Sequence, residues 1–249
     1  MCDSISWEEA YTRELSNHKT SPDDEGTIWF SDSGAEEKMV DFLDCYADDG
    51  LLFKDEVNEA GAAPSSFLDL GTGNGHLLFA LREAGWDGVM VGVDYSGKSV
   101  ELARQISDLK LNEDDDEDDD ESEDEEDGRS KEPVHFAEYD LFNPTSIPRA
   151  PKDGFDVVLD KGTFDAISLS SETGEDGRRI CERYREAMLP LLKKEGYFLI
   201  TSCNWTEEEL KGWFEVEGML NVCDSIKYPS FTFGGKMGSS VVSLCFRKT

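Results

Sequence analysis

The sequence predicts an α/β fold in which a mostly parallel sheet is covered by helices on both faces and ends in an antiparallel pair of strands. Strand-like and helix-like runs alternate between residues 66 and 214, at the spacing expected of parallel strands joined by helices. The first strand leads into the glycine-rich turn LGTGNG, and such turns lie at the ligand-binding edge of open α/β sheets. Two β-rich runs near the end of the chain have no helical segment between them, which indicates antiparallel pairing.

Two strand–helix units form the first half of the predicted sheet. The apolar run 66–70 is the first strand, and the run 75–86 is a helix because its leucines recur on one face. The run 88–94 is the second strand and the run 96–111 the second helix. We expect the carboxyl ends of these two parallel strands to meet at one edge of the sheet.

A dense acidic run follows the second helix. Residues 113–127 comprise fourteen acidic residues and one serine. Such a run repels itself and buries no apolar surface, so we expect a disordered insertion at about 113–131. The insertion either has no task of its own or tethers a basic partner protein.

The second half of the chain completes the sheet. Strands are predicted at 134–140, 155–160 and 197–203, with a long helix at 177–196 before the last of them. Thr206 and Glu209 have the spacing of a capping box, which predicts that a helix begins there and runs to residue 214. In the tail, 220–228 and 239–248 form the antiparallel pair, joined by the glycine-rich stretch 229–238.

Composition limits the class of protein. The 249 residues, 38% of them hydrophobic, suffice for one substantial core, so we expect a single domain over residues 1–249 with an N-terminal lid or helical segment at 1–64. No apolar run approaches the roughly 20 residues of a membrane helix, and the N-terminus lacks the order of a signal peptide. A cytoplasmic location is expected, with the nucleus as a second one, and the chain is expected to be a monomer.

Charge and cysteine usage exclude several kinds of site. The net charge of −32 disfavours direct binding to nucleic acid. The six cysteines and three histidines are scattered without a CxxC pair, so neither a metal site nor a disulfide framework is predicted.

The glycine turn predicts the ligand. Gly71, Gly73 and Gly75 have the spacing G-x-G-x-G and follow Asp69. The dinucleotide fingerprint G-x-G-x-x-G has its third glycine one place later. The observed spacing matches the pattern in which the loop wraps the amino-acid end of S-adenosylmethionine.

Acidic residues at the next strand ends support a nucleoside-like ligand. Asp94 ends the second strand, where a carboxylate can accept hydrogen bonds from both ribose hydroxyls. Asp140 ends the third strand, where it can accept from the exocyclic amine of adenine while the Leu141 N–H reaches a ring nitrogen. Each aspartate alone is also explained as a turn or cap residue. Acidic residues at successive strand ends favour a shared ligand.

These stretches resemble the motifs of the seven-β-strand methyltransferases, namely FLDLGTGNG, VGVDYS, AEYDLF and FDVVLDKGTFDAI. Within that superfamily the chain is similar to the elongation factor 1-alpha lysine methyltransferases in DKGTFDAISL, ITSCNWTEEEL, FTFGG, WEEAYTREL and GTIWF. The acidic run departs from this family. The resemblance implies a Rossmann-like seven-stranded sheet and an S-adenosylmethionine-dependent protein-lysine N-methyltransferase whose protein substrate is translation elongation factor 1-alpha.

The resemblance also implies the site residues. The cofactor contacts are Asp69, Gly71, Thr72, Gly73, Asn74, Gly75, Asp94, Tyr95, Asp140, Leu141 and Asp160. Asp160, with Thr163 nearby, is expected where the methyl donor and acceptor meet: its carboxylate would orient the lysine amine, and its carbonyl would lie near the amino group of the donor. Aromatic walls for the lysine are expected from Trp29, Phe30, Phe164 and Trp205. Core packing is the alternative for each ring, least so for Trp29, which lies in a glycine-containing stretch suited to a lid.

Other functions stay open at this point. The same fold methylates other proteins and small molecules, and fold alone does not decide between substrates. A nicotinamide-dependent oxidoreductase would use a related sheet, although the glycine spacing and the antiparallel tail count against it. A non-catalytic acidic interaction protein on a methyltransferase scaffold is suggested only by the acidic run, and the intact acids at the strand ends speak against it.

Overall fold

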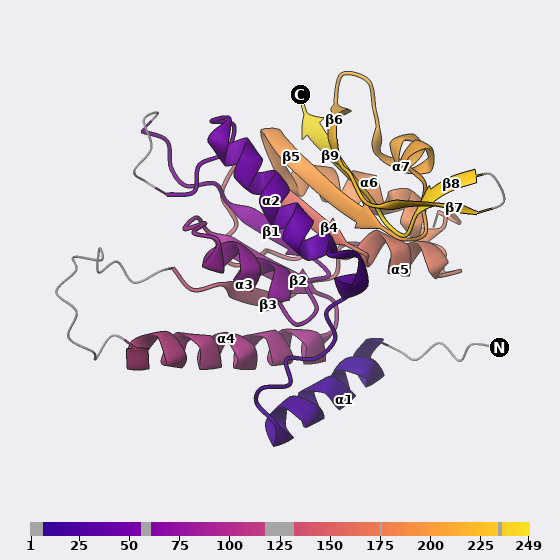
Figure 1. Cartoon of the computed structure of the whole chain (residues 1–249). Coiled ribbons are helices and arrows are strands. Elements are labelled where there is room, and N and C mark those ends of the chain that lie inside the picture. Colours follow the sequence, from indigo (N-terminus) through magenta and orange to yellow (C-terminus); the bar gives the residue numbers. More distant parts are fainter. Residues whose placement is uncertain (1–6, 56–60, 118–131, 175, 234–235) are drawn as a thin grey trace.

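A computed structural model describes residues 7–55, 61–117, 132–174, 176–233 and 236–249 (Figure 1). A seven-stranded sheet with the order β3-β2-β1-β4-β5-β9-β6 lies at the centre of this part of the chain. Its parallel strands are β1 (Phe67–Leu70), β2 (Met90–Asp94), β3 (His135–Glu138), β4 (Phe155–Lys161) and β5 (Leu192–Ser202). The antiparallel strands are β6 (Leu220–Ile226) and β9 (Val242–Lys248), which confirms the expected tail.

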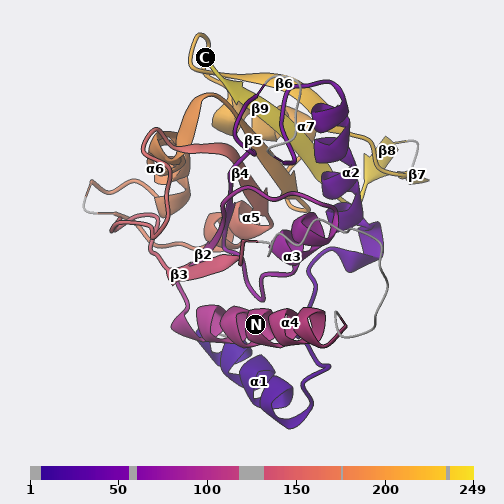
Figure 2. The same cartoon turned by 90° about the vertical axis from the view of Figure 1, so that its left-hand side faces the viewer.

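Helices cover both faces of the sheet (Figures 1 and 2). One face, called the α2 face here, packs against α1 (Trp7–Thr20), α2 (Ala35–Asp48), α3 (His76–Glu83) and α4 (Gly97–Glu117). The other, called the α5 face, packs against α5 (Thr163–Leu169), α6 (Tyr184–Met188) and α7 (Glu207–Phe214). The two faces have separate apolar cores, because successive side chains of each strand point to opposite sides.

The α2 face carries the N-terminal segment. Residues 21–34 join α1 to α2 and include the 3₁₀ turn η1 (Ser31–Ser33), and we call them the strap. Helix α1 lies alongside α4 in both views, away from the antiparallel strands (Figures 1 and 2). Tyr11 and Leu15 of α1 belong to the core of this face. The segment is therefore part of the fold and covers one side of the strand ends.

One predicted helix is wrong. The run 177–196 forms η2 (Ile180–Arg183), the five-residue α6, η3 (Leu189–Leu191) and the start of β5 at Leu192. Pro190 explains the break, because proline has no N–H to donate and its ring clashes with the preceding helical turn.

Three smaller differences from the sequence prediction concern two additional elements and one helix end. Helix α5 follows β4 directly and was not predicted. The expected connection at 229–238 contains the hairpin of β7 (Ser230–Phe233) and β8 (Lys236–Ser239). Helix α4 continues to Glu117, so the first residues of the acidic run are helical, since extending a formed helix costs little. Residues 118–131 of the expected disordered insertion lie outside the described residues.

The predicted start of α7 is confirmed. Thr206 accepts from the backbone N–H of Glu209 at 3.3 Å, and Glu209 Oε2 accepts from the backbone N–H of Thr206 at 2.9 Å. Among the described residues, no helix is long and apolar enough to cross a membrane.

Candidate active site

The glycine loop begins where β1 ends and adopts left-handed backbone conformations. The φ angles are 67° at Gly71, 60° at Gly73 and 83° at Gly75, values that favour glycine over residues with a Cβ atom. A Cβ atom at Gly71, Gly73 or Gly75 would collide with the side chain of Thr163, Tyr11 or Phe136, respectively. The glycines are therefore needed for the backbone and for close packing of three other elements around the loop.

Asp94 lies beside this loop at the end of β2. Its side chain is buried and accepts from the backbone N–H of Gly73 at 3.1 Å and of Ser96 at 2.9 Å. Each carboxylate oxygen keeps a lone pair for a further donor. Burial raises the pKa of Asp94, and hydrogen bonds from the Ser96 N–H, the Ser99 side chain and the Gly73 N–H oppose that rise. The geometry agrees with the predicted contact to ribose hydroxyls.

Asp69 is a second buried carboxylate on the same face. Burial raises its pKa to about 7, and the negative charges of Glu36 and Asp94 add to the rise while Lys161 opposes it. Two buried carboxylates next to a left-handed loop are best stabilised by a ligand that brings hydroxyl donors and positive charge. The ribose, ammonium and sulfonium of S-adenosylmethionine supply those groups, so the donor set fits this cofactor.

The predicted adenine-side residues lie at the rim. Strand β3 ends at Glu138, and Asp140 is an exposed turn residue whose Oδ1 accepts from the N–H of Phe142 at 2.9 Å. Leu141 is partly buried, and Tyr95 is 56% exposed. These side chains are open to a ligand that reaches past the end of β2.

Two predicted loop residues are buried. Thr72 and Asn74 are both shielded from solvent. The Asn74 amide donates to the carbonyl of Glu25 in the strap at 2.9 Å. Asn74 therefore connects the glycine loop to the strap.

Helix α1 closes the loop from the N-terminal side. The hydroxyl of Tyr11 lies over Gly73, and burial together with the charge of Asp94 raises the pKa of Tyr11. Ser96, in the turn after β2, donates to Glu8 at 2.5 Å. Helix α1 thus contacts Gly73 and Ser96, the same residues that hold the Asp94 carboxylate.

Lys161 fixes the strap to the end of β4. Its ammonium donates to the carbonyl of Trp29 at 3.1 Å and lies 3.9 Å from Glu36. Burial lowers the pKa of Lys161, and Glu36 opposes that shift. Phe30 has a φ of 66°, and its ring lies against Gly162, where a Cβ atom would approach it to 3.0 Å. The strap is therefore held at the strand end by a charged group and an aromatic ring.

Asp160 has a different surrounding from the one expected. Its side chain is fully buried on the α5 face, and it accepts from the N–H of Thr163 at 2.8 Å, the N–H of Phe164 at 3.0 Å and the hydroxyl of Tyr184 at 2.5 Å. Burial raises its pKa to about 7, and the Tyr184 hydrogen bond opposes the rise. These donors make the carboxylate the anchor of the first turn of α5 and separate it from an incoming amine.

Strand alternation explains this difference. Leu70 pairs with Asp160 and belongs to the α5-face core, whereas Asp69 pairs with Leu159 of the α2-face core. The side chain of Asp160 therefore points away from Asp69, while the next residue, Lys161, points to the same side as Asp69.

The predicted aromatic wall divides between the two faces. Phe164 is 1% exposed within a cluster formed by Tyr184, Trp205, Trp213 and Phe214, so it is a core residue. Trp205 is half-buried at the edge of that cluster, and its indole donates to the Ser168 hydroxyl at 3.2 Å. Trp29, 46% exposed, packs edge-on against Trp7 at 5.3 Å.

Four residues at the site were not predicted from the sequence: Tyr11, Glu36, His76 and Lys161. His76 follows the glycine loop, and its Nδ1 lies 2.5 Å from Glu36. The alternation of Asp160 and Lys161 in β4 was a usable signal for Lys161. His76 is next to Gly75 in the sequence, but its contact with Glu36, like the positions of Tyr11 and Glu36, depends on long-range packing, for which the sequence gives no spacing.

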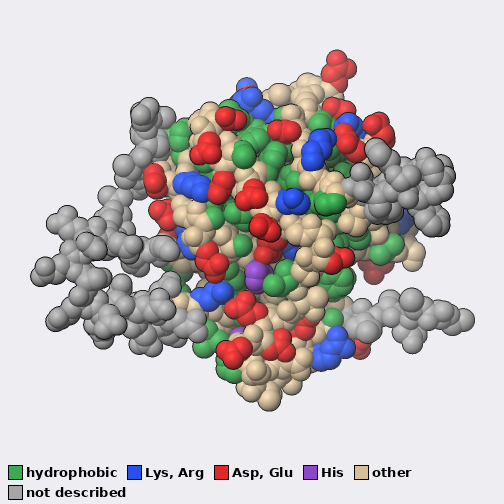
Figure 3. Space-filling view, viewed as in Figure 1, with side chains coloured by type: hydrophobic (Ala, Val, Ile, Leu, Met, Phe, Trp, Pro, Cys, Tyr) green, Lys and Arg blue, Asp and Glu red, His purple; other side chains and the backbone are tan. Residues whose placement is uncertain are grey.

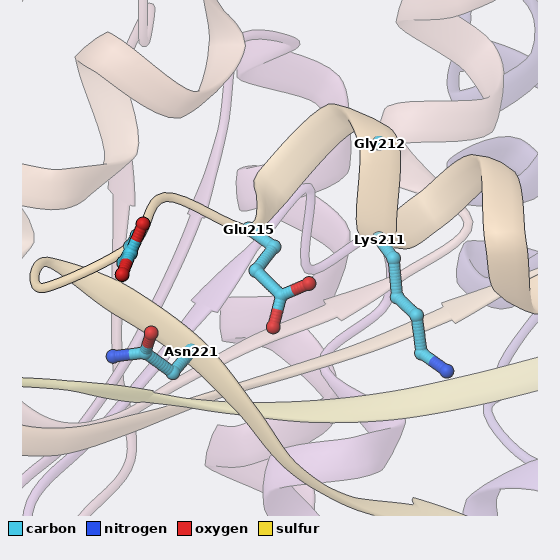
Figure 4. Close-up of a pocket in the computed structure, with 5 residues that line it drawn as sticks. Lys211, Gly212, Glu215 and Asn221 are labelled. Atoms are coloured by element: carbon cyan, nitrogen blue, oxygen red, sulfur yellow. The ribbon is translucent and has the colours of Figure 1, made fainter.

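A surface depression lies at the end of the sheet opposite to the glycine loop. It is lined by Lys211, Gly212, Glu215, Glu217 and Asn221, between α7 and the start of β6 (Figure 4). Asn221 of β6 pairs with Arg247 of β9, and Arg247 pairs with Tyr197 of β5. Tyr197 pairs with Val157 of β4, and Val157 pairs with Phe67, the first residue of β1. The carboxyl ends of the strands, with their buried acids, lie at the other edge.

Comparisons with known proteins show the family of this chain. A methyltransferase domain model matches residues 63–115, which include the glycine loop and Asp94. The chain is 38% identical to protein-lysine N-methyltransferase EFM4 of Saccharomyces cerevisiae, over 97% of this chain and 92% of that protein. It is 32% identical to EEF1A lysine methyltransferase 2 of Homo sapiens, over 97% of this chain and 84% of that protein.

The chain belongs to this family of protein-lysine N-methyltransferases.

Solved structures agree on the fold of this methyltransferase. The N-methyltransferase NodS from Bradyrhizobium japonicum, in complex with S-adenosyl-l-homocysteine, superposes with a TM-score of 0.51 at 13% identity, over 96% of this chain and 97% of NodS. The [4+2]-cyclase SpnF superposes with a TM-score of 0.50 at 14% identity, over 84% of this chain and 80% of SpnF. The predicted Rossmann-like methyltransferase sheet is confirmed.

Proposed function

We propose that this protein transfers a methyl group from S-adenosylmethionine to a lysine side chain of translation elongation factor 1-alpha. The carrying observation is the similarity, over nearly the whole chain, to relatives named as lysine methyltransferases of that factor. The protein is an enzyme and its substrate is a protein. The buried carboxylates Asp69 and Asp94 beside the glycine loop supply the matching cofactor site.

The chain's own residues hold and shield the cofactor. When bound, S-adenosylmethionine supplies a methyl group activated by a positively charged sulfur. Asp94 would accept hydrogen bonds from the ribose hydroxyls in the position in which the Gly73 and Ser96 N–H groups already hold it. Asp69 adds negative charge beneath the loop, and α1 with Tyr11 excludes water from the same side. A cationic ligand also favours the ionised form of Asp69.

Methyl transfer to lysine needs a neutral amine in line with the methyl group and little water around either. The strap is suited to form one wall of the lysine path, because Lys161 holds Trp29 beside the end of β4. An aromatic face stabilises a lysine head that arrives as a cation. Trp29 is the exposed ring at this position.

Surface charge supports a basic protein partner. Acidic side chains are spread over the face that carries α2 and α3, with isolated basic ones among them (Figure 3). The chain as a whole has a net charge of −32. A negative surface raises the encounter rate with a positively charged region of a substrate, and salt weakens this effect.

The test is transfer of isotopically labelled methyl groups to purified elongation factor 1-alpha, followed by mass spectrometry of its lysine peptides. We expect one dominant methylated lysine peptide with the wild-type enzyme. The matched control is Asp94→Ala, which should lose transfer at a cofactor concentration that saturates the wild type. Labelled lysines in other proteins of a lysate, but not in the elongation factor, would overturn the proposed substrate while leaving lysine methylation as the reaction.

Location and assembly are parts of the same proposal. A cytoplasmic enzyme would meet a translation factor directly, and a monomer would leave the strap free for a large substrate. Fluorescence of a tagged chain tests the first, and sedimentation at micromolar concentration tests the second.

A further inference from the structure

Two thiols meet where β6 and β9 pair, on the α2 face. Val222 pairs with Phe246 and Asp224 pairs with Cys245, so Cys223 is the extra residue of a β-bulge in β6. A bulge re-aims the side chain that it inserts. Here it brings Cys223 next to Cys245 of the neighbouring strand.

The contacts between them are short. The Cys223 thiol donates to the Cys245 carbonyl oxygen at 3.3 Å, and each thiol shifts the pKa of the other. The hydroxyl of Tyr46, on α2, lies 3.7 Å from the Cys223 sulfur. Three elements thus converge on one sulfur atom.

The two thiols differ in exposure and acidity. Cys223 is exposed, whereas Cys245 is 1% exposed. Hydrogen bonds from Cys245 and Tyr46, with the charge of Arg247, lower the pKa of the Cys223 thiol, against its burial and the charge of Asp224. Burial raises the pKa of Cys245. An exposed thiol of lowered pKa next to a buried thiol is the arrangement of an attacking and a resolving cysteine.

Other described cysteines provide a contrast. Cys203 is exposed, but burial of its thiol and the charge of Asp165 raise its pKa to about 11. Cys181 is buried among apolar side chains. Cys45 is exposed on α2. An exposed thiol alone therefore does not reproduce the surroundings of Cys223.

We propose that Cys223 and Cys245 form a peroxide-sensitive dithiol site that closes to a disulfide between β6 and β9. The Cys223 thiolate attacks one oxygen of hydrogen peroxide, the O–O bond breaks, and a sulfenic acid and hydroxide form. The Cys245 sulfur then attacks the Cys223 sulfur, the S–O bond breaks, and the thiol proton leaves with the hydroxyl as water. The hydroxide takes up the proton that the Cys223 thiol lost on ionising, so two thiols are oxidised, one peroxide is reduced, and two waters form in all.

The site is separate from the methyl-transfer site. Cys245 pairs with Leu199 in the interior of β5, whereas the cofactor loop and strap lie at the carboxyl ends of β1, β2 and β4. The reaction needs no cofactor, so its outcome and that of the methyl-transfer experiments are independent.

The test uses the full chain treated with an equimolar amount of hydrogen peroxide and then digested with trypsin without reducing agent. The cleavage sites place Cys223 in peptide 212–227 and Cys245 in peptide 237–247. We expect these two peptides to be joined, two hydrogens lighter than the sum of the reduced peptides. Their cross-link should form at least about threefold faster than any modification of Cys203 or Cys45, as the lower pKa favours attack.

Three variants sharpen the result, each checked for wild-type far-ultraviolet circular dichroism. Cys223→Ser should abolish the cross-link, and Tyr46→Phe should slow the loss of the Cys223 thiol. Cys203→Ser, the matched control, should leave the cross-link unchanged. The proposal is overturned if Cys223 goes to sulfinic acid without joining Cys245, if either thiol links to a different cysteine instead, or if Cys203 reacts first.

Discussion

Asp94 and Asp160 lie at the carboxyl ends of β2 and β4, yet their side chains point to opposite faces of the sheet and have different neighbours. Both are buried, and burial raises the pKa of both. Asp94 is held by two turn amides under a cover made of polar and charged contacts. Asp160 is held by two helix amides and Tyr184 inside an aromatic cluster.

The difference teaches how to separate a ligand carboxylate from a structural one. Burial of the side chain and the direction of its pKa shift do not distinguish these two carboxylates. The discriminating features are the face to which strand alternation sends the side chain, and whether the surrounding packing leaves room for another donor. On the α2 face the N-terminal segment contacts the loop residues through polar groups, while the α5 face is closed by packed rings.

The largest expected effect breaks the structural side of this comparison. Asp160→Ala leaves two N–H groups and the Tyr184 hydroxyl without their acceptor in a dry site, so the free energy of unfolding should fall by about 3 kcal/mol or more. Urea unfolding followed by circular dichroism measures it. Tyr184→Phe, which removes one donor, should lose about 1–2 kcal/mol. An Asp160→Ala protein with wild-type stability and no transfer would return Asp160 to a catalytic role.

A smaller effect is expected where the strap meets β4. Lys161→Met keeps the volume of the side chain but removes the donor to the Trp29 carbonyl, so kcat/KM for the elongation factor should fall about tenfold through misplacement of the strap. Lys161→Arg keeps a donor and should recover part of the loss. Amide hydrogen exchange should be faster in the strap of Lys161→Met than in the wild type. Unchanged exchange together with lower activity would mean that Lys161 acts on the reacting groups directly.

Local sequence signals predicted most of the cofactor half. The glycine turn, Asp94 and the capping box at Thr206 each depend on residues a few places apart, and the structure confirms the turn and the cap. The parallel strands and the antiparallel tail follow from hydrophobic patterns of the same short range.

What the sequence did not predict depends on long-range packing. The place of Tyr11 over Gly73 requires the path of the whole N-terminal segment. The role of Asp160 required knowing which face α5 and Tyr184 cover. Pro190 is visible in the sequence, and it ends the helical pattern of its neighbours after Met188.

The smallest expected effect is the pH dependence of the α2 face. The hydrogen bond with Glu36, helped by the charge of Glu25, raises the pKa of His76, while burial and Lys110 oppose it. This pair stabilises the fold fully below the unfolded pKa of histidine, about 6.5, and is lost as pH rises through the raised folded value. Burial raises the pKa of Asp69 to about 7, so its ionisation also costs stability as pH rises towards 7.

Both groups act in the same direction, so the free energy of unfolding of the cofactor-free protein should be lower at pH 8.5 than at pH 6. Urea unfolding at the two pH values tests this, with His76→Gln as the variant that should flatten the change. A stability that rises over this interval would show that the His76–Glu36 contact between α3 and α2 does not form in solution.

The most direct test of the account is the affinity for S-adenosylmethionine of Asp94→Asn and Asp160→Asn, measured by calorimetry at a temperature where both variants are folded. Asp94→Asn removes the charge and an acceptor from the ribose contact, so its affinity should fall by at least about tenfold, or roughly 1.4 kcal/mol. Asp160→Asn should bind within about threefold of the wild type, since its side chain faces the α5 core. Wild-type affinity in Asp94→Asn with a large loss in Asp160→Asn would contradict the assignment of the cofactor to the α2 face.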